Sequence, residues 1–255
     1  MSFATKRTGG FAHLGGAEDG LALLRRVAWA VTPFVERVLL RIIALDLLDA
    51  YVGKIAGARV YGGQIERGAV VPVDAAILMA DLRDFTGLSE KLGDTETVDL
   101  LNRYFDTLGE AIAAHDGQIL KFIGDGLLAV FPIAATAAAK DVAEAALSAS
   151  IRARANLARL NDTLAAEGKQ RIDFGIGLHQ GGVAFGNIGA GTRLDFTVIG
   201  TAVNTASRLQ DLTKKLGQPI LASAAFQQGL GRPMRSLGFH ALRGVAAPIE
   251  VFAPD

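Results

Sequence analysis

A helical stripe of apolar residues is the first pattern along the chain. Its members recur at steps of three or four, close to the 3.5-residue repeat of a coiled coil: Leu24, Val27, Val31, Phe34, Val38, Ile42, Leu45 and Leu48. Pro33 is expected to kink this helix or to begin a second one. The stripe either packs on the protein's own core or pairs with its copy in a dimer, and residues 51–69 are expected to form a helical turn and linker.

Strand-length apolar runs begin near Val71 and alternate with helical patterns. The run VDAAILMADL predicts a central strand. The next pattern predicts a helix that has Asp94 as its N-cap and an apolar face made by Val98, Leu101, Phe105, Leu108 and Ile112. A hairpin is predicted at 118–124 and 127–131, and a long alanine-rich helix at about 135–167.

The C-terminal half continues this alternation. IDFGIGLHQGGVAFGNIG predicts a strand with a glycine-marked turn, FTVIG a short strand, and TAVNTASRLQDLTKKLG a helix that ends at Gly217. Further strands are predicted at 220–223, 234–243 and 249–253. The order βαββαβ, followed by extra elements, predicts an α/β fold (an α+β sandwich) with a ferredoxin-like core and mixed strand directions. We expect two parts, an N-terminal helical segment at 1–69 and a folded domain at 70–255.

Composition narrows the classes of function. Half of the 255 residues are apolar and 20% are charged, which is typical of a soluble globular protein. The 26 basic residues balance 26 acidic ones, so no net field favours nucleic acid. The absence of cysteine excludes disulfides and thiolate chemistry and agrees with a cytoplasmic protein. No export signal is present, and the longest uncharged piece of 21–52, VAWAVTPFV, is too short to insert into a membrane.

Two aspartates stand where predicted strands end. Asp81 follows the central strand at the start of a short helix, and Asp125 lies between two glycines at the hairpin turn. Alone, each would serve as a cap or a turn residue. If the strand lies beside the hairpin, however, the two carboxylates meet at one end of the sheet and repel unless a cation lies between them. Oxygen ligands beside a helix start suit Mg²⁺ bound with a phosphate, so we predict a metal site here.

Four segments in order resemble the catalytic domain of class III nucleotidyl cyclases: ADLRDFT, GQILKFIGDGLLAVF, FGIGLHQGGVAFGNIG and FTVIGTAVNTASRL. The resemblance runs from about residue 73 to 252. It implies an enzyme that forms a cyclic nucleotide from a nucleoside triphosphate at a homodimer interface. It also implies two divalent cations per active site, Mg²⁺ or Mn²⁺, held by Asp81 and Asp125.

The same resemblance assigns roles in substrate binding. Asn204 matches the residue that positions the ribose, and Arg208 the residue that contacts the α-phosphate in the transition state; arginine suits this role because its planar fork matches phosphate oxygens. The peptide N–H groups of Phe85 and Thr86 are expected to hold the triphosphate. Arg243 is the candidate for a further triphosphate contact near the C-terminus.

Two positions bear on the choice of base. Lys121 and Thr197 match the base-selecting positions of the family. An ammonium group only donates and therefore favours adenine, whose N1 accepts, whereas the Thr197 hydroxyl can accept or donate. We therefore predict an adenylate cyclase that converts ATP to 3′,5′-cyclic AMP and pyrophosphate. The alternatives are a guanylate cyclase, a diguanylate-forming enzyme, whose acid-rich turn is missing here, and a catalytically weak nucleotide-binding regulatory module.

Three further features qualify this resemblance. Asp84 stands where related sequences have glycine, and it points either into the triphosphate site or outward as a cap. His179 is interpreted as structural. Residues 1–69 resemble the closing strand and last helix of a GAF-type sensor domain. This predicts either a fragment of a longer enzyme with an upstream sensor domain or a short member that keeps the remnant as a lever between the halves of a dimer.

Overall fold

A computed structural model describes residues 70–133, 138–190 and 193–255 of the chain. The apolar stripe, the kink at Pro33, the linker and the sensor remnant predicted for 1–69 lie outside the described residues. The first described elements are β1 (Val70–Leu82), α3 (Phe85–Ser89), α4 (Asp94–Ala113), β2 (Gln118–Ile123), β3 (Gly126–Pro132) and α5 (Ala139–Ala166). They are followed by β4 (Phe174–Ala190), β5 (Arg193–Ile199), α6 (Thr201–Leu216), β6 (Ile220–Ser223), α7 (Ala224–Leu230), β7 (Arg235–His240) and β8 (Ile249–Ala253).

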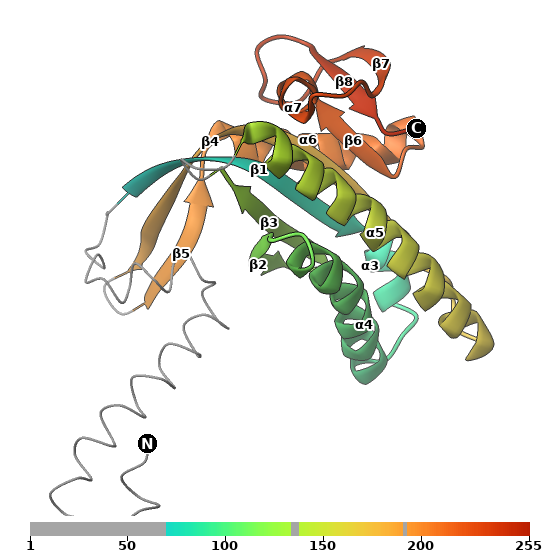
Figure 1. The fold of residues 1–255 in the computed structure, drawn as a ribbon. Helices are drawn as coiled ribbons and strands as arrows, with labels where there is room; N and C mark the ends of the chain where they lie inside the picture. Colours follow the sequence, from blue (N-terminus) through green and yellow to red (C-terminus); the bar gives the residue numbers. More distant parts are fainter. Residues whose placement is uncertain (1–69, 134–137, 191–192) are drawn as a thin grey trace, which may run out of the picture. The chain divides into compact units, whose positions relative to one another are not determined.

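The described strands form one mixed sheet in the order β2-β3-β1-β4-β6-β8-β7, and β5 also pairs with β4. β4 and β6 run parallel, whereas the other pairs are antiparallel. Alternate residues of β1 face opposite sides, because a strand has a period of two. Leu78 and Ala80 pack with α4 and α5, and Ile77 packs with Ala202 and Ala206 of α6. The predicted sandwich with its βαββαβ core is confirmed (Figure 1).

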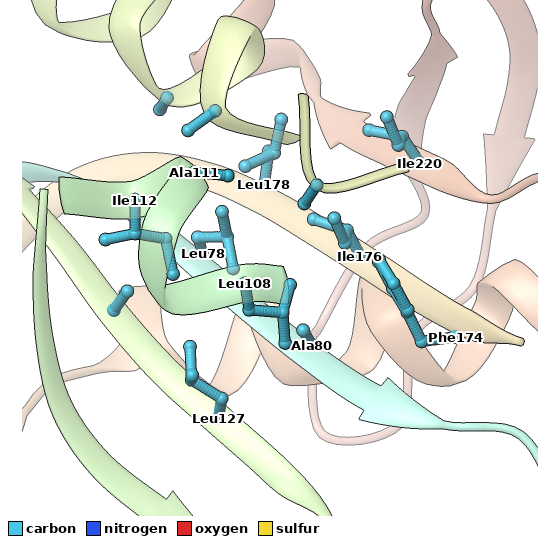
Figure 2. Packing of buried hydrophobic residues seen from close by; sticks show 14 of the residues in the cluster. Leu78, Ala80, Leu108, Ala111, Ile112, Leu127, Phe174, Ile176, Leu178 and Ile220 are labelled. Carbon is cyan, nitrogen blue, oxygen red and sulfur yellow. The ribbon is translucent and has the colours of Figure 1, made fainter. Parts of the chain in front are cut away.

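The main core lies between the sheet and helices α4 and α5. Figure 2 shows Leu78 and Leu178 of the two central strands beside Leu108 and Ile112 of α4. All four side chains are at most 1% exposed. This dense packing fixes how α4 lies across the sheet, and so positions the end of β1 relative to the helix.

The predicted buried face of α4 is partly wrong. Leu108 and Ile112 are buried as expected, but Val98 is 57% exposed. Tyr104 and Ala111 take the central positions instead. Leu101 and Phe105 lie at the border of the core, and the Phe105 ring packs on Phe122 with 4.5 Å between centroids. The interpretation from sequence counted only aliphatic residues and Phe, and so missed a core face that includes a tyrosine and an alanine.

The glycine-marked turn predicted inside 172–189 is also wrong, because β4 is one continuous strand. Two of its glycines allow α6 to approach closely. A Cβ at Gly177 would lie 2.1 Å from the carbonyl oxygen of Ala206, and one at Gly175 would lie 2.0 Å from Oγ1 of Thr213. Glycine inside a strand commonly marks such a close backbone approach. The effect is to hold α6 against the sheet beside the end of β1.

Other predicted boundaries agree with the structure only in part. The N-cap of α4 is Gly93, and Asp94, which was predicted to cap the helix, is its first residue. The hairpin of β2 and β3 is confirmed, and α6 ends at Gly217, whose φ of 61° belongs to the left-handed region. The strand predicted at 234–243 is shorter, because β7 ends at His240. Helix α7 was not predicted; the Ser223 side chain caps it by accepting from the N–H of Phe226 at 3.2 Å. Among the described residues no helix is long and apolar enough to cross a bilayer.

Candidate active site

The pairing of β1 with β3 brings Asp81 to the hairpin turn that holds Asp125. Asp81 lies opposite Gly126 in the antiparallel register, and Asp125 is the residue just before it. The two carboxyl groups share a hydrogen bond. The turn itself needs Gly124, whose φ is +62°. Two side chains that are 44 positions apart in sequence thus meet at one end of the sheet, as the strand pattern predicted.

The electrostatics of this pair are those of a crowded acidic site. Burial, the negative charges of Asp125 and Asp211, and the hydrogen bond with Asp125 together raise the pKa of Asp81 to about 6, and burial is the largest of these causes. Burial also raises the pKa of Asp125, while its backbone and Asp81 hydrogen bonds oppose that shift. Two buried carboxylates this close together repel each other when both are ionised, unless a cation neutralises them. The pair therefore fits a divalent metal ion.

A pocket of about 480 Å³ opens beside the two aspartates. It is bounded by the end of β1, by α3 with the loop before it, by the hairpin turn and by the last turns of α6. Its lining residues are Asp81, Leu82, Arg83, Asp84, Phe85, Thr86, Gly87, Asp125, Gln210, Asp211, Thr213 and Lys214. The first backbone bond of α3 runs from the N–H of Leu88 to the carbonyl of Asp84. The N–H groups of Phe85 and Thr86 precede it, so they are orphan donors of a helix start.

Asp84 does not join the aspartate pair. It has a left-handed backbone with φ 56°, which aspartate tolerates better than most residues, and its exposed carboxylate pairs with Lys214 of α6. The Lys214 ammonium lowers the pKa of Asp84. The ion pair joins the loop before α3 to α6 at the rim of the pocket, and the outward-facing alternative for Asp84 is the one observed.

Asp211 is a pocket residue that the sequence interpretation missed. It lies on α6, its charge acts on Asp81, and its carboxylate is 3.2 Å from a guanidinium nitrogen of Arg208. A signal was available, because residues three apart on a helix are neighbours and Arg208 had already been singled out. The structure therefore links Arg208, through Asp211, to the acidic end of the pocket.

The remaining predicted site residues lie outside this pocket. Arg208 and the exposed Asn204 are both on α6, but neither is among the described lining residues. Lys121 is on β2 and Thr197 on β5, two strands that contact each other. Arg243 is exposed in the segment between β7 and β8, not at a strand end. One chain thus brings together Asp81, Asp125, Phe85 and Thr86 around the pocket. The other five predicted site residues do not line it.

His179 agrees with its structural interpretation. Its Nδ1 lies 2.7 Å from Oγ of Ser223, and burial lowers its pKa to about 4. The ring therefore stays neutral across the physiological range and joins β4 to the start of α7.

A metal ion would need ligands beyond the protein. No cluster of three or more His, Cys, Asp or Glu suited to a metal is found within 70–133, 138–190 and 193–255. Asp81 and Asp125 would supply two carboxylates, and water or phosphate oxygens the rest. Mg²⁺ is commonly bound in this way, through one or two carboxylates and the phosphates of a substrate.

Comparison with known proteins identifies the family. Residues 72–228 match the adenylate and guanylate cyclase catalytic domain. An adenylate cyclase of Anabaena cylindrica is 38% identical over 173 residues, which cover 66% of this chain and 33% of that protein. Adenylate cyclase 1 of Rhizobium meliloti (strain 1021) is 36% identical over 154 residues, which cover 60% and 23%. The chain thus matches a third or less of the length of these two relatives.

Solved structures show the same similarity. The adenylyl cyclase CyaB of P. aeruginosa has a TM-score of 0.65 at 31% identity, covering 72% of this chain and 94% of that one. The guanylyl cyclase Cya2 has a TM-score of 0.62, also at 31% identity, covering 73% and 92%. Because the family match spans more than half of the sequence and contains the aspartate pair, this chain belongs to the family of adenylate and guanylate cyclase catalytic domains.

Proposed function

We propose that the chain is an adenylate cyclase that converts ATP to 3′,5′-cyclic AMP and pyrophosphate. The observation that carries the proposal is the Asp81–Asp125 pair at the edge of a pocket that also contains the start of α3. In the reaction the ribose 3′-oxygen forms a bond to the α-phosphorus, the bond from that phosphorus to the bridging oxygen breaks, and the 3′-hydroxyl loses its proton. The relatives named adenylate cyclase support this choice.

Asp81 and Asp125 are proposed to hold the divalent cations, two Mg²⁺ or Mn²⁺ per site. Bound there, such ions would lower the pKa of the 3′-hydroxyl and neutralise charge on the leaving pyrophosphate. The N–H groups of Phe85 and Thr86 bind triphosphate oxygens, because the start of a helix favours negative charge. Arg208 contacts the α-phosphate, Asn204 holds the ribose, and Arg243 is a further triphosphate contact.

The site is proposed to be completed by a second copy of the chain. Asn204 and Arg208 do not line the pocket of their own metal aspartates. In a homodimer, one chain supplies Asp81 and Asp125 while its partner supplies the ribose and phosphate contacts, so a two-fold axis produces two equivalent sites.

Lys121 and Thr197 are proposed to select adenine. The ammonium group of Lys121 donates to adenine N1, and the Thr197 hydroxyl accepts from the amino group. The hydroxyl can also donate, and the guanylyl cyclase Cya2 is as similar in sequence as CyaB. Guanylate formation is therefore the second candidate.

Residues 1–69 are proposed to be an N-terminal helical segment, the remnant of an upstream sensor domain together with a transducer helix, before a cytoplasmic catalytic domain at 70–255. Support comes from the curated relatives, which extend well beyond the matched region.

Product analysis tests this function. Purified protein is incubated with ATP or GTP and Mn²⁺, and the products are separated and identified. We expect cyclic AMP from ATP, little cyclic GMP from GTP, and no product from Asp81→Ala protein. Cyclic GMP as the main product would support the guanylate alternative, and no cyclic nucleotide from either substrate would contradict both.

A further inference from the structure

Tyr104 is a buried, ionisable residue of α4 that the proposed chemistry does not use. Its side chain is 0% exposed. The ring centroid lies 5.0 Å from that of Phe105 and 5.6 Å from that of Phe174. Phe174 pairs with Leu82, and the next residue of β4, Gly175, pairs with Asp81. The aromatic contacts therefore hold the tyrosine ring beside the end of β1.

The hydroxyl group of Tyr104 is buried without a hydrogen-bond partner in the described part of the chain. Buried tyrosine hydroxyl groups normally find a partner, and an unsatisfied one requires an explanation. The two charges that act on this hydroxyl are the carboxylates of Asp81 and Asp125. The Tyr104 hydroxyl, a donor without a partner, thus lies close enough to the Asp81 and Asp125 carboxylates for their charge to act on it.

We propose that Tyr104 is a positioning residue, whose hydroxyl donates a hydrogen bond to the Asp81–Asp125 carboxylates and orients them for the divalent cation. This inference rests on the metal site of the proposed function. When both carboxylates turn toward a cation, their shared hydrogen bond is lost and each has oxygen lone pairs to satisfy. The Tyr104 hydroxyl has no acceptor in reach among the described residues as the carboxylates now lie, so a carboxylate must turn toward it, and the phenol then rotates its O–H bond to donate. Such outer contacts usually tune metal affinity.

If Tyr104 served only to pack the core, removing its hydroxyl would not change metal binding. Phenylalanine fills the same space and keeps both aromatic contacts, so Tyr104→Phe protein would bind metal like the wild type. Removing an unsatisfied buried hydroxyl would also leave the fold as stable or make it more stable.

Direct Mn²⁺ binding, measured by electron paramagnetic resonance of the free ion, separates these roles. We expect Tyr104→Phe to raise the Kd for Mn²⁺ about tenfold or more, with unchanged circular dichroism and no loss of thermal stability in EDTA. Thr107→Val is the matched control. It removes a buried hydroxyl from the same helix, one whose hydrogen bond goes to the Tyr104 carbonyl at 2.7 Å, and should leave the Kd unchanged.

Asp81→Ala protein separates failure of the inference from failure of the site. If Asp81→Ala abolishes Mn²⁺ binding while Tyr104→Phe binds like the wild type, the role of Tyr104 is overturned and the metal site stands. If Asp81→Ala binds Mn²⁺ as tightly as the wild type, both are overturned.

Discussion

A Cβ atom at position 126 would lie 2.9 Å from Oδ1 of Asp81, closer than real Cβ atoms approach. The same atom would lie 3.2 Å and 3.3 Å from the carbonyl oxygens of Ile123 and Ala80. The glycine after Asp125 therefore provides the space in which the Asp81 carboxylate meets its partner.

Gly126→Ala should displace the Asp81 carboxylate. We expect destabilisation of about 1–3 kcal/mol from overpacking and turnover lowered by about ten- to a hundredfold. Chemical denaturation and cyclase assays measure both effects. Gly109→Ala is the control, because its Cβ would meet only Ile119 Cδ1 at 3.6 Å and alanine favours a helix. If Gly126→Ala protein kept wild-type turnover and Mn²⁺ dependence, the position of the Asp81 carboxylate would not depend on the space at Gly126.

The stability of the metal-free protein should depend on pH through Asp81. Its folded pKa of about 6 exceeds the ordinary 3.8, so the folded state binds more protons and loses stability as pH rises through this window. The full shift corresponds to about 3 kcal/mol, and half-exposure reduces it to on the order of 1 kcal/mol. Asp81→Asn should therefore gain stability relative to wild type between pH 4.5 and 7 in EDTA.

His179 opposes this trend over nearly the same range. Its folded pKa of about 4 lies below the ordinary 6.5, so its contribution to stability is present above pH 6.5 and is lost as pH falls toward 4. The wild-type profile should consequently be flatter than that of Asp81→Asn, and saturating Mn²⁺ should stabilise only the wild type. Parallel profiles for the two proteins in urea denaturation would show that Asp81 has an ordinary pKa.

The exposed pair of Asp84 and Lys214 should tune nucleotide affinity through charge. Lys214→Ala leaves an unpaired carboxylate at the pocket rim, and we expect the KM for ATP to rise about two- to fivefold. Asp84→Asn removes that charge and should lower the KM, while the double variant should lie near the wild type. Raising the salt concentration should shrink these differences. Identical KM values for all four proteins would show that the pair does not act on the substrate.

Base preference should follow Lys121. Glutamate at this position accepts from guanine N1 and repels adenine N1, so Lys121→Glu should lower ATP turnover about a hundredfold and raise the ratio of GTP to ATP turnover. Initial rates with each nucleotide measure the change. Lys140→Glu, on the exposed side of α5, makes the same charge change and should leave the ratio unaltered. An unchanged ratio in the Lys121 variant would remove this residue from base selection.

The sequence was sufficient to predict that Asp81 and Asp125 meet, because each lies at the end of a predicted strand, whereas their binding of metal stays a prediction. β3 and the second half of β1, residues 75–80, lie in the core, so the ends of these runs reveal where the backbone emerges from it. Periodicity was a weaker guide on α4, where Tyr104 was overlooked because tyrosine has a polar group and an apolar ring.

Contacts between distant segments were beyond prediction from the sequence. The glycines of β4 were interpreted as a turn. They are needed instead because the backbone of α6, some 30 residues later in the sequence, packs closely against them. Asp84 could point either way until its partner Lys214 was known. In each case the conformation is set by contact with a residue far along the chain, and local propensity carries no information about such contacts.

In the proposed dimer one chain supplies the metal aspartates while a second supplies Asn204 and Arg208. Mixing inactive Asp81→Ala protein with inactive Arg208→Ala protein tests it most directly. Random exchange makes half of the dimers mixed, and each mixed dimer has one intact site of two. We therefore expect the mixture to recover about a quarter of wild-type turnover. No recovery, although differently tagged copies co-purify as heterodimers, would contradict it.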